Sequence, residues 1–156
     1  MVDEVMLAHL SQNEDVARIA SAPDRVQLLW EVCQIPDFRN IHTDAHPRLL
    51  TSIYRYLAKP NSKLPVDWLG EQVLRLDRYD GDIDQLSSRL AGIRVWTYVS
   101  HKHHWLEDAN HWQERTRAIE DKLSDVLHER LTQRFVDRRT SVLLKSLKDK
   151  SELMST

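Results

Sequence analysis

The residues with the greatest chemical capability lie in one stretch, VWTYVSHKHHWLEDANHW, which spans residues 95–112 and contains four histidines. Three imidazoles can hold a zinc ion and leave one coordination position open, which makes His101, His104 and His111 candidate ligands. No carboxylate or cysteine lies at a recognised ligand spacing, and Lys102 adds a like charge among them. Solvated histidines at the C-terminal end of a helix, where they favour the helix dipole, are the simpler interpretation. We therefore expect no metal ligand here.

The three tryptophans of this stretch could instead stack nucleic-acid bases, as aromatic side chains do in proteins that bind single strands. Trp96 and Trp112 each extend an apolar helical face, so packing explains them more simply. Trp105 lies in the connection between two expected helices and remains the candidate for base stacking.

Basic residues accumulate towards the end of the sequence. Residues 130–150 carry seven bases and two acids, a net charge of +5, whereas residues 1–40 carry seven acids and three arginines, a net charge of −4. A basic helix face can follow a phosphate backbone, although most such faces are only solvated. The candidate phosphate contacts are Arg130, Arg134, Arg138, Arg139, Lys145 and Lys148.

Catalytic signatures are absent from the sequence. It contains no Walker A motif, no dinucleotide-binding glycine motif, no H-E-x-x-H and no G-x-S-x-G. Cys33 lies in an apolar helical run, where a cysteine is buried and inert. The run DGDIDQ (residues 80–85) begins like an EF-hand loop, but Gln85 and Ala91 stand where that loop needs glycine and glutamate. We expect a helix start there instead, with Asp82 as its cap.

The elements that position these residues are predicted to be helices. Only three glycines occur in 156 residues, which argues against a hairpin-rich β fold. Apolar residues recur at helical spacing between proline and capping signals. We expect an all-α protein, a compact bundle of about six or seven helices with a long C-terminal helix. Its predicted parts are a short helical segment (1–20), a single domain (21–148) and a disordered tail (149–156).

Individual helix boundaries follow from local signals. Pro23 suits a first helical turn, and Pro36 and Pro60 end helical runs. Thr43 or Asp44 caps one helix, and Pro65 opens the next. A buried central helix is expected over residues 82–100, and the long final helix over residues 110–148, with Asn110 and Gln113 spaced like a capping box.

The expected cell compartment follows from features that the sequence lacks. The single cysteine excludes an internal disulfide and suits a reducing environment. No run approaches eighteen apolar residues, and the acidic start MVDEVMLAHL lacks the pattern of a signal peptide. We expect a cytoplasmic protein without membrane contact.

Three runs, taken together, resemble the C-terminal helical region of degradosome-type superfamily 2 RNA helicases, the mitochondrial degradosome helicases and their bacterial relatives. In that family an aromatic-rich helix ending in a Trp-x-Ser-Tyr-type run precedes a helix rich in acids and leucines. VWTYVSH followed by IEDKLSDVL matches that order here, and the resemblance covers roughly residues 20–145. The runs are VQLLWEVCQIPDFRN (26–40), LPVDWLGEQVLRLD (64–77) and the whole of residues 89–139.

The resemblance implies an accessory module. Members of that family have two RecA-like ATPase domains followed by an all-α region that helps close a channel around single-stranded nucleic acid. The ATP-binding motifs lie in the RecA-like domains, so the chain would be a fragment with no enzymatic activity of its own. ATP and Mg²⁺ would serve the parent helicase. The implied partners are the RecA-like core, single-stranded RNA or DNA, and an exoribonuclease.

A different class of function stays open. The chain could be a free-standing helical domain that dimerises or docks another protein through its long C-terminal helix. The apolar stripe of that helix shifts beyond Leu127, which gives it a second surface. The residues expected there are Leu131, Phe135, Val142 and Leu143.

Overall fold

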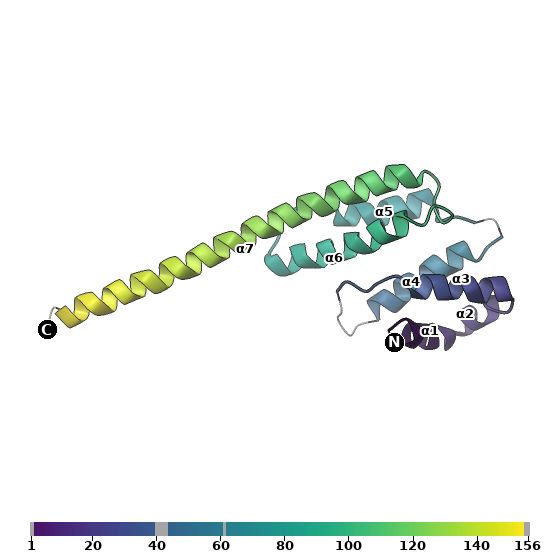
Figure 1. Ribbon diagram of the computed structural model, residues 1–156, viewed down its shortest axis with the longest axis horizontal. Coiled ribbons are helices and arrows are strands. Elements are labelled where there is room, and N and C mark those ends of the chain that lie inside the picture. The colour runs from purple at the N-terminus through teal and green to yellow at the C-terminus, as the bar shows by residue number, and fades with distance from the viewer. Residues whose placement is uncertain (1, 40–43, 61, 155–156) are drawn as a thin grey trace.

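A computed structural model describes residues 2–39, 44–60 and 62–154 of the chain, and every regular element in these ranges is a helix. The prediction of an all-α bundle with a long C-terminal helix is confirmed (Figure 1). Four short helices form an N-terminal group and three further helices form a second group beside it. The helices are α1 (Val2–Ser11), α2 (Glu14–Ile19), α3 (Pro23–Cys33), α4 (Ala45–Leu57), α5 (Val66–Leu76), α6 (Ile83–Ser100) and α7 (Ala109–Met154).

The starts of three helices in the N-terminal group differ in how they are capped. The Asn13 side chain accepts hydrogen bonds from the backbone N–H groups of Asp15 (2.9 Å) and Val16 (3.3 Å) at the start of α2. Pro23 occupies the first position of α3, as predicted. Asp44 precedes α4 without a side-chain capping bond, and Thr43, the other predicted cap, lies outside the described residues.

Packing makes the first two helices part of the domain. Leu10 of α1 and Val16 of α2 are buried in the same core as Leu50 of α4. Tyr54 is fully buried, and its hydroxyl donates to the carbonyl oxygen of Arg25 over 2.8 Å. The apolar side chains of α1 and α2 thus help to complete the core of the N-terminal group.

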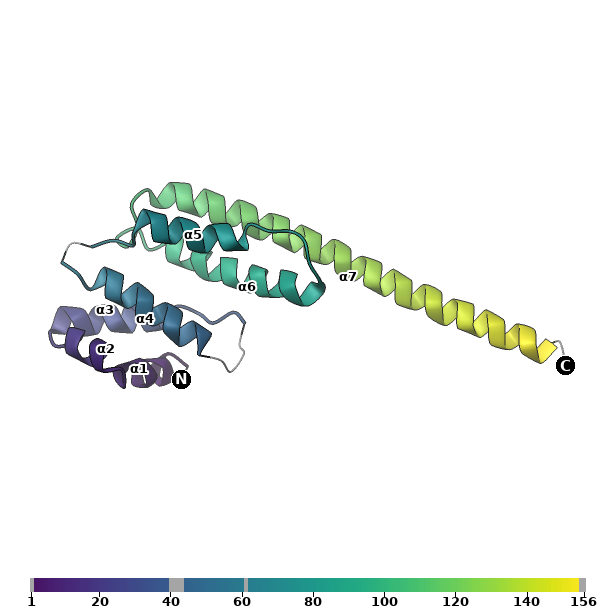
Figure 2. The ribbon, with the colours of Figure 1, turned by 180° about the vertical axis from the view of Figure 1, so that it is seen from behind.

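The two groups meet through aromatic rings, and a backbone bond ties the connection between α4 and α5 to the connection between α6 and α7. Trp68 of α5 lies 4.9 Å from Tyr56 of α4 and 5.6 Å from Trp96 of α6, measured between ring centroids. The N–H of Leu64 donates to the carbonyl oxygen of Trp105 over 2.8 Å. Figure 2 shows α5, α6 and the first part of α7 side by side, next to the N-terminal group.

The final helix differs from its prediction at both ends. It begins at Ala109, after Asp108 with a φ of 56°, and continues to Met154. The predicted capping box does not form, because Asn110 lies inside the helix, and the Gln113 amide donates to the carbonyl oxygen of Ser100 over 3.0 Å. The predicted disordered tail is helical as far as Met154, and residues 155–156 lie outside the described residues.

Candidate nucleic-acid interface

The last half of α7 leaves the body of the molecule and projects alone (Figure 1). Leu123 is the last buried residue along this helix, and every side chain from residue 128 to residue 154 is exposed. We call residues 128–154 the arm. At 1.5 Å per residue it is about 40 Å long. The candidate phosphate contacts all lie on it.

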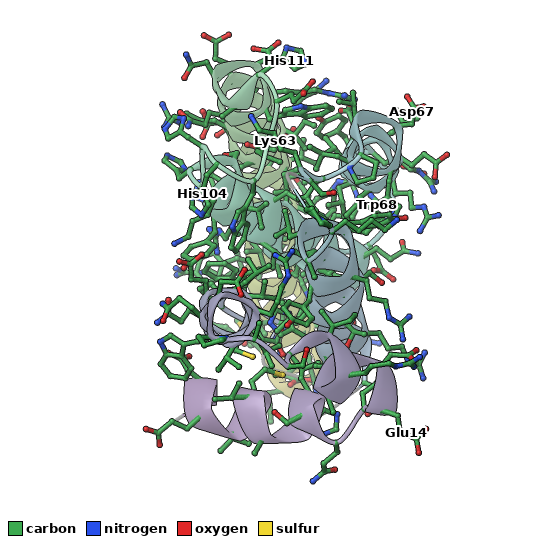
Figure 3. All side chains as sticks on the ribbon, turned by 90° about the vertical axis from the view of Figure 1, so that its right-hand side faces the viewer. Glu14, Lys63, Asp67, Trp68, His104 and His111 are labelled. Carbon is green, nitrogen blue, oxygen red and sulfur yellow. The ribbon has the colours of Figure 1, made fainter. Side chains whose placement is uncertain are left out.

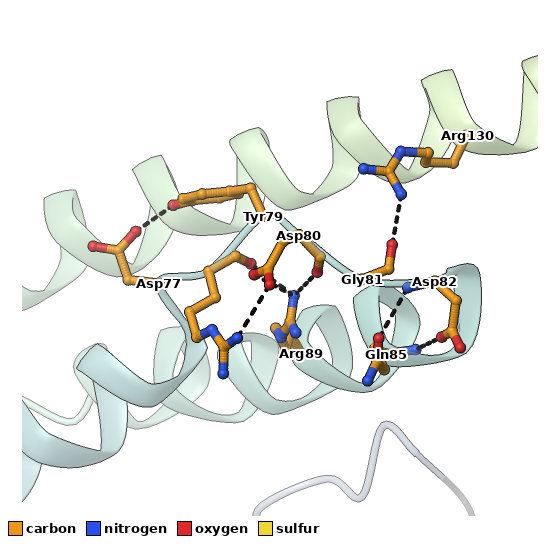
Figure 4. Close-up of polar contacts among 9 residues, drawn as sticks. Asp77, Tyr79, Asp80, Gly81, Asp82, Gln85, Arg89 and Arg130 are labelled. Carbon is orange, nitrogen blue, oxygen red and sulfur yellow. Dashed lines mark hydrogen bonds and ion pairs between the residues drawn. The ribbon is translucent and has the colours of Figure 1, made fainter.

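A loop between α5 and α6 holds the base of the arm (Figure 4). The Arg130 guanidinium donates to the carbonyl oxygen of Gly81 over 2.5 Å. A little more than two turns earlier on α7, the Lys122 ammonium lies 4.1 Å from the ring centroid of Tyr79, a cation–π contact. These two contacts fix α7 against residues 77–82 at the point where the body ends.

The loop itself is ordered by short-range polar contacts. The Tyr79 hydroxyl donates to Asp77 over 2.5 Å, and the Arg89 guanidinium donates to the carbonyl oxygens of Arg78 (3.1 Å) and Asp80. Burial, the hydrogen bond to Asp77 and the charge of that carboxylate all raise the pKa of Tyr79. The phenol therefore stays a neutral donor at physiological pH.

The start of α6 follows directly and confirms its prediction. Asp82 accepts from the N–H of Gln85 over 2.8 Å, while the Gln85 side chain accepts from the N–H of Asp82 over 2.9 Å, a complete capping box. Gly81, with a φ of 104°, makes the sharp turn that precedes it. The aspartates of this run thus build a helix start.

The basic side chains of the arm are divided among its sides. Because successive residues turn by about 100°, five of the six fall within roughly one quarter of the circumference. We call the four that lie beyond Arg130 the basic strip: Arg134, Arg138, Lys145 and Lys148. Two other predicted contacts differ from them. Arg130 is engaged by Gly81, and the guanidinium of Arg139 lies 5.5 Å from the ring centroid of Phe135, about 100° around the helix from Arg138.

The groove between the arm and the start of α6 carries both signs of charge. It has a volume of about 780 Å³. Arg134 and Arg138 line one wall, whereas Asp82 and Asp84 line the other, and Asp137 lies on the arm itself. A phosphate would meet carboxylates on this side of the arm base, so the outer part of the basic strip is the better surface for an anion.

The structure places Trp105 in the core. Its side chain is 1% exposed, and its indole Nε1 has no hydrogen-bond partner among the described residues. A base needs an exposed ring face on which to stack. The structure therefore favours the packing role of Trp105 over the stacking role, and Trp96 and Trp112 are buried as predicted.

The corner histidines are exposed, as expected. Figure 3 shows His104 and His111 on the outside of the molecule at this end. His104 lies 3.4 Å from the Glu31 carboxylate, and His101 Nδ1 lies 2.8 Å from the carbonyl oxygen of Thr97. Within the described ranges no three histidine, cysteine or acidic side chains are grouped so that they could hold a metal ion.

Sequence reasoning missed the contacts at the base of the arm. Tyr79 and Gly81 bind α7 through a ring face and a backbone carbonyl, and neither feature has a sequence pattern of its own. The signal that could have found them is the run RYDGD itself (residues 78–82), since a loop with that density of polar groups next to a buried helix needs internal partners.

Comparison of the chain with protein-family models, with curated proteins and with solved structures finds no match. In the part of the chain that the structure describes, no helix combines the length and the apolar character needed to cross a membrane. The assignment of a function therefore depends on the arm, its charge and the sequence resemblance.

Proposed function

We propose that this chain is the accessory C-terminal helical domain of a cytoplasmic, ATP-dependent superfamily 2 helicase of the degradosome type. In this proposal the body packs on the RecA-like core, and the arm guides single-stranded nucleic acid by contacting its phosphates. ATP and Mg²⁺ belong to the RecA-like domains of the parent, because this chain carries none of their motifs. An exoribonuclease is a proposed partner of that parent.

The observation that carries the proposal is the basic strip. Arg134, Arg138, Lys145 and Lys148 are exposed on one side of a helix that projects about 40 Å from the body. A single strand laid along this side can reach several phosphates without bending towards the body. The contacts would be independent of base sequence, which suits an enzyme that moves along a strand.

Support for the helicase part comes from the position of the resemblance in the fold. The longest similar run, residues 89–139, covers most of α6, the corner with its tryptophans and α7 as far as the first half of the arm. The resemblance thus extends over the packed core of the second helix group and into the element that carries the strip.

Binding to a labelled single strand tests the nucleic-acid part. We expect residues 1–156 to bind a 20-nucleotide RNA or DNA weakly, with a salt slope of about −3 for four phosphate contacts, since each contact on a single strand contributes about −0.7. The triple variant Arg134→Glu, Arg138→Glu, Lys145→Glu should weaken binding at least about tenfold and lower the slope by about 2.

The matched control reverses three charges on the body. Arg48→Glu, Lys59→Glu and Lys63→Glu change net charge by the same amount at exposed positions away from the arm. Equal losses of affinity in the two triple variants would show a dependence on net charge alone and would contradict the role of the strip.

For the helicase part, a coding frame that continues upstream of Met1 into a Walker A motif is the expected result, and an in-frame stop codon immediately upstream would contradict it.

A further inference from the structure

Apolar side chains of the arm are exposed in unusual number. Val136 is 47% exposed, Leu143 60%, Leu147 55% and Met154 78%. Most of the stability of protein helices comes from packing of one face, and large exposed apolar surfaces mark sites of association. The arm therefore carries an apolar surface that the body does not cover.

These apolar residues follow the spacing of a coiled coil. Six positions alternate in steps of four and three, which is the heptad pattern in which two helices stay in contact. We call these positions the seam: Val136, Thr140, Leu143, Leu147, Lys150 and Met154. Leu131, Phe135 and Val142 lie about 120° away, so of the four residues predicted for a partner surface only Leu143 belongs to the seam.

The distribution of charge on the arm allows a second copy of the same chain to be its partner. At about 100° per residue, the centre of the seam lies roughly 160° from the centre of the basic strip. The positions that flank the seam in the heptad carry one base, Arg139, and are otherwise uncharged or acidic: Asp137, Leu144, Ser146, Ser151 and Leu153. Two arms can therefore approach along their seams while their strips point away from each other.

We propose that two copies of this chain pair through their seams, with the arms antiparallel. In that orientation Leu143 packs beside Leu147 of the second copy, Val136 beside Met154, and Thr140 beside Lys150. A parallel pair would place the two Lys150 ammonium groups against each other, which costs free energy. A two-fold interface uses the same surface patch on both subunits, so that patch must be complementary to itself.

The dimensions of the arm permit this pair. The overlap of residues 136–154 is about 27 Å long, and the centre of the overlap lies about 27 Å from the point where each arm leaves its body. The bodies then stand at opposite ends without collision. A contact of this size is small among specific interfaces, so we expect micromolar affinity. Both basic strips would remain on the outside of the pair.

Sedimentation equilibrium of residues 1–156 over about 1 to 200 µM tests the pairing. We expect the mass to rise from 18.4 kDa towards twice that value. Leu143→Gln with Leu147→Gln should raise the dissociation constant about a hundredfold or more, because four leucines leave the interface. Lys145→Gln with Lys148→Gln is the matched control, with the same new residue in the same segment on the opposite side, and it should leave the constant within about threefold.

Folding of each variant can be checked independently. All five tryptophans lie between residues 30 and 112, so their fluorescence reports the body and not the arm. A monomer at every concentration, with native tryptophan fluorescence, would overturn the proposal and leave the seam to another protein. A dimer that the seam and control variants affect equally would overturn it as well.

Oxidative cross-linking tests the orientation. Ser146→Cys lies near the two-fold axis of the antiparallel pair and should form a disulfide with its own copy. Thr140→Cys is displaced from its copy by about 15 Å in that pair and should not. Cys33 is 2% exposed and does not compete. Cross-linking at position 140 but not at 146 would overturn the antiparallel arrangement.

Discussion

Cys33 lies on the inner side of α3, 2% exposed, and burial raises the pKa of its thiol to about 11, with the Asp3 charge as a smaller cause. The predicted inertness of this residue has a physical basis, since the thiolate is the reactive form and burial disfavours it. The same burial makes stability depend on pH.

Stability should fall between about pH 9 and pH 11. The pKa of the folded protein is raised above the usual thiol value of 9.0, so the stabilisation is complete below pH 9 and is lost as pH rises to about 11. The loss is on the order of 2 kcal/mol. Urea unfolding of Cys33→Ala should show a shallower decline in this window. Tyr54 and Tyr79, whose pKa values burial also raises, are present in both proteins.

At the scale of single residues, prediction worked where burial alone decides the outcome. Trp96, Trp112 and Cys33 sit in apolar helical runs and are buried. Prediction did not anticipate the burial of Trp105, because that residue lies in a connection between helices. The path of this connection depends on contacts distant in sequence, such as the backbone hydrogen bond from Leu64. A loop tryptophan is exposed or buried according to which helix approaches it.

The helix starts show how far local signals reach. Asp82 caps α6 as predicted, Gln85 completes a capping box with it, and the loop before them turns at Gly81. Asn110 and Gln113 have the same spacing but form no box, because α7 already begins at Ala109 and Asn110 lies inside the helix. Spacing identifies a capping box only when the first of the two residues directly precedes the helix.

Two glycine substitutions should change the free energy of unfolding in opposite directions. Gly70→Ala places a Cβ within ordinary contact of Trp112, 3.8 Å away, inside α5, so we expect a gain of about 0.5 to 1 kcal/mol from the lower entropy of the unfolded chain. Gly81→Ala should cost about 1 to 2 kcal/mol, because φ is 104° and the new Cβ meets the Gln85 side-chain oxygen. Chemical denaturation of both variants measures the difference. A loss for both would contradict the expected helical fit at Gly70.

Across the whole molecule, the sequence marks the shift of the apolar stripe beyond Leu127 but does not show that α7 leaves the body there. Apolar residues continue past Leu127 at a density like that of the core-facing part, so composition does not show that the body ends there. The extent of the body is set by the lengths of α5 and α6, which leave nothing to cover the later turns of α7. The length of a helix was thus easier to predict than its surroundings.

Removal of the arm should leave the body folded. A chain of residues 1–127 loses no buried side chain and one hydrogen bond to the body, from Arg130 to Gly81. We expect the melting temperature, followed by tryptophan fluorescence at low protein concentration, to change by less than about 5 °C. A larger decrease would show that the arm stabilises the body through contacts in a dimer or along α7.

The two contacts at the base of the arm determine how far the tip of the arm moves when the loop shifts. Lys122 and Arg130 grip the loop at points about 12 Å apart along α7, and the tip at Met154 lies about 36 Å beyond the second. If Tyr79 acts as the fulcrum, a displacement of 1 Å at Gly81 swings the tip by about 4 Å. Small adjustments in residues 77–82 thus become large changes in where the end of the arm points.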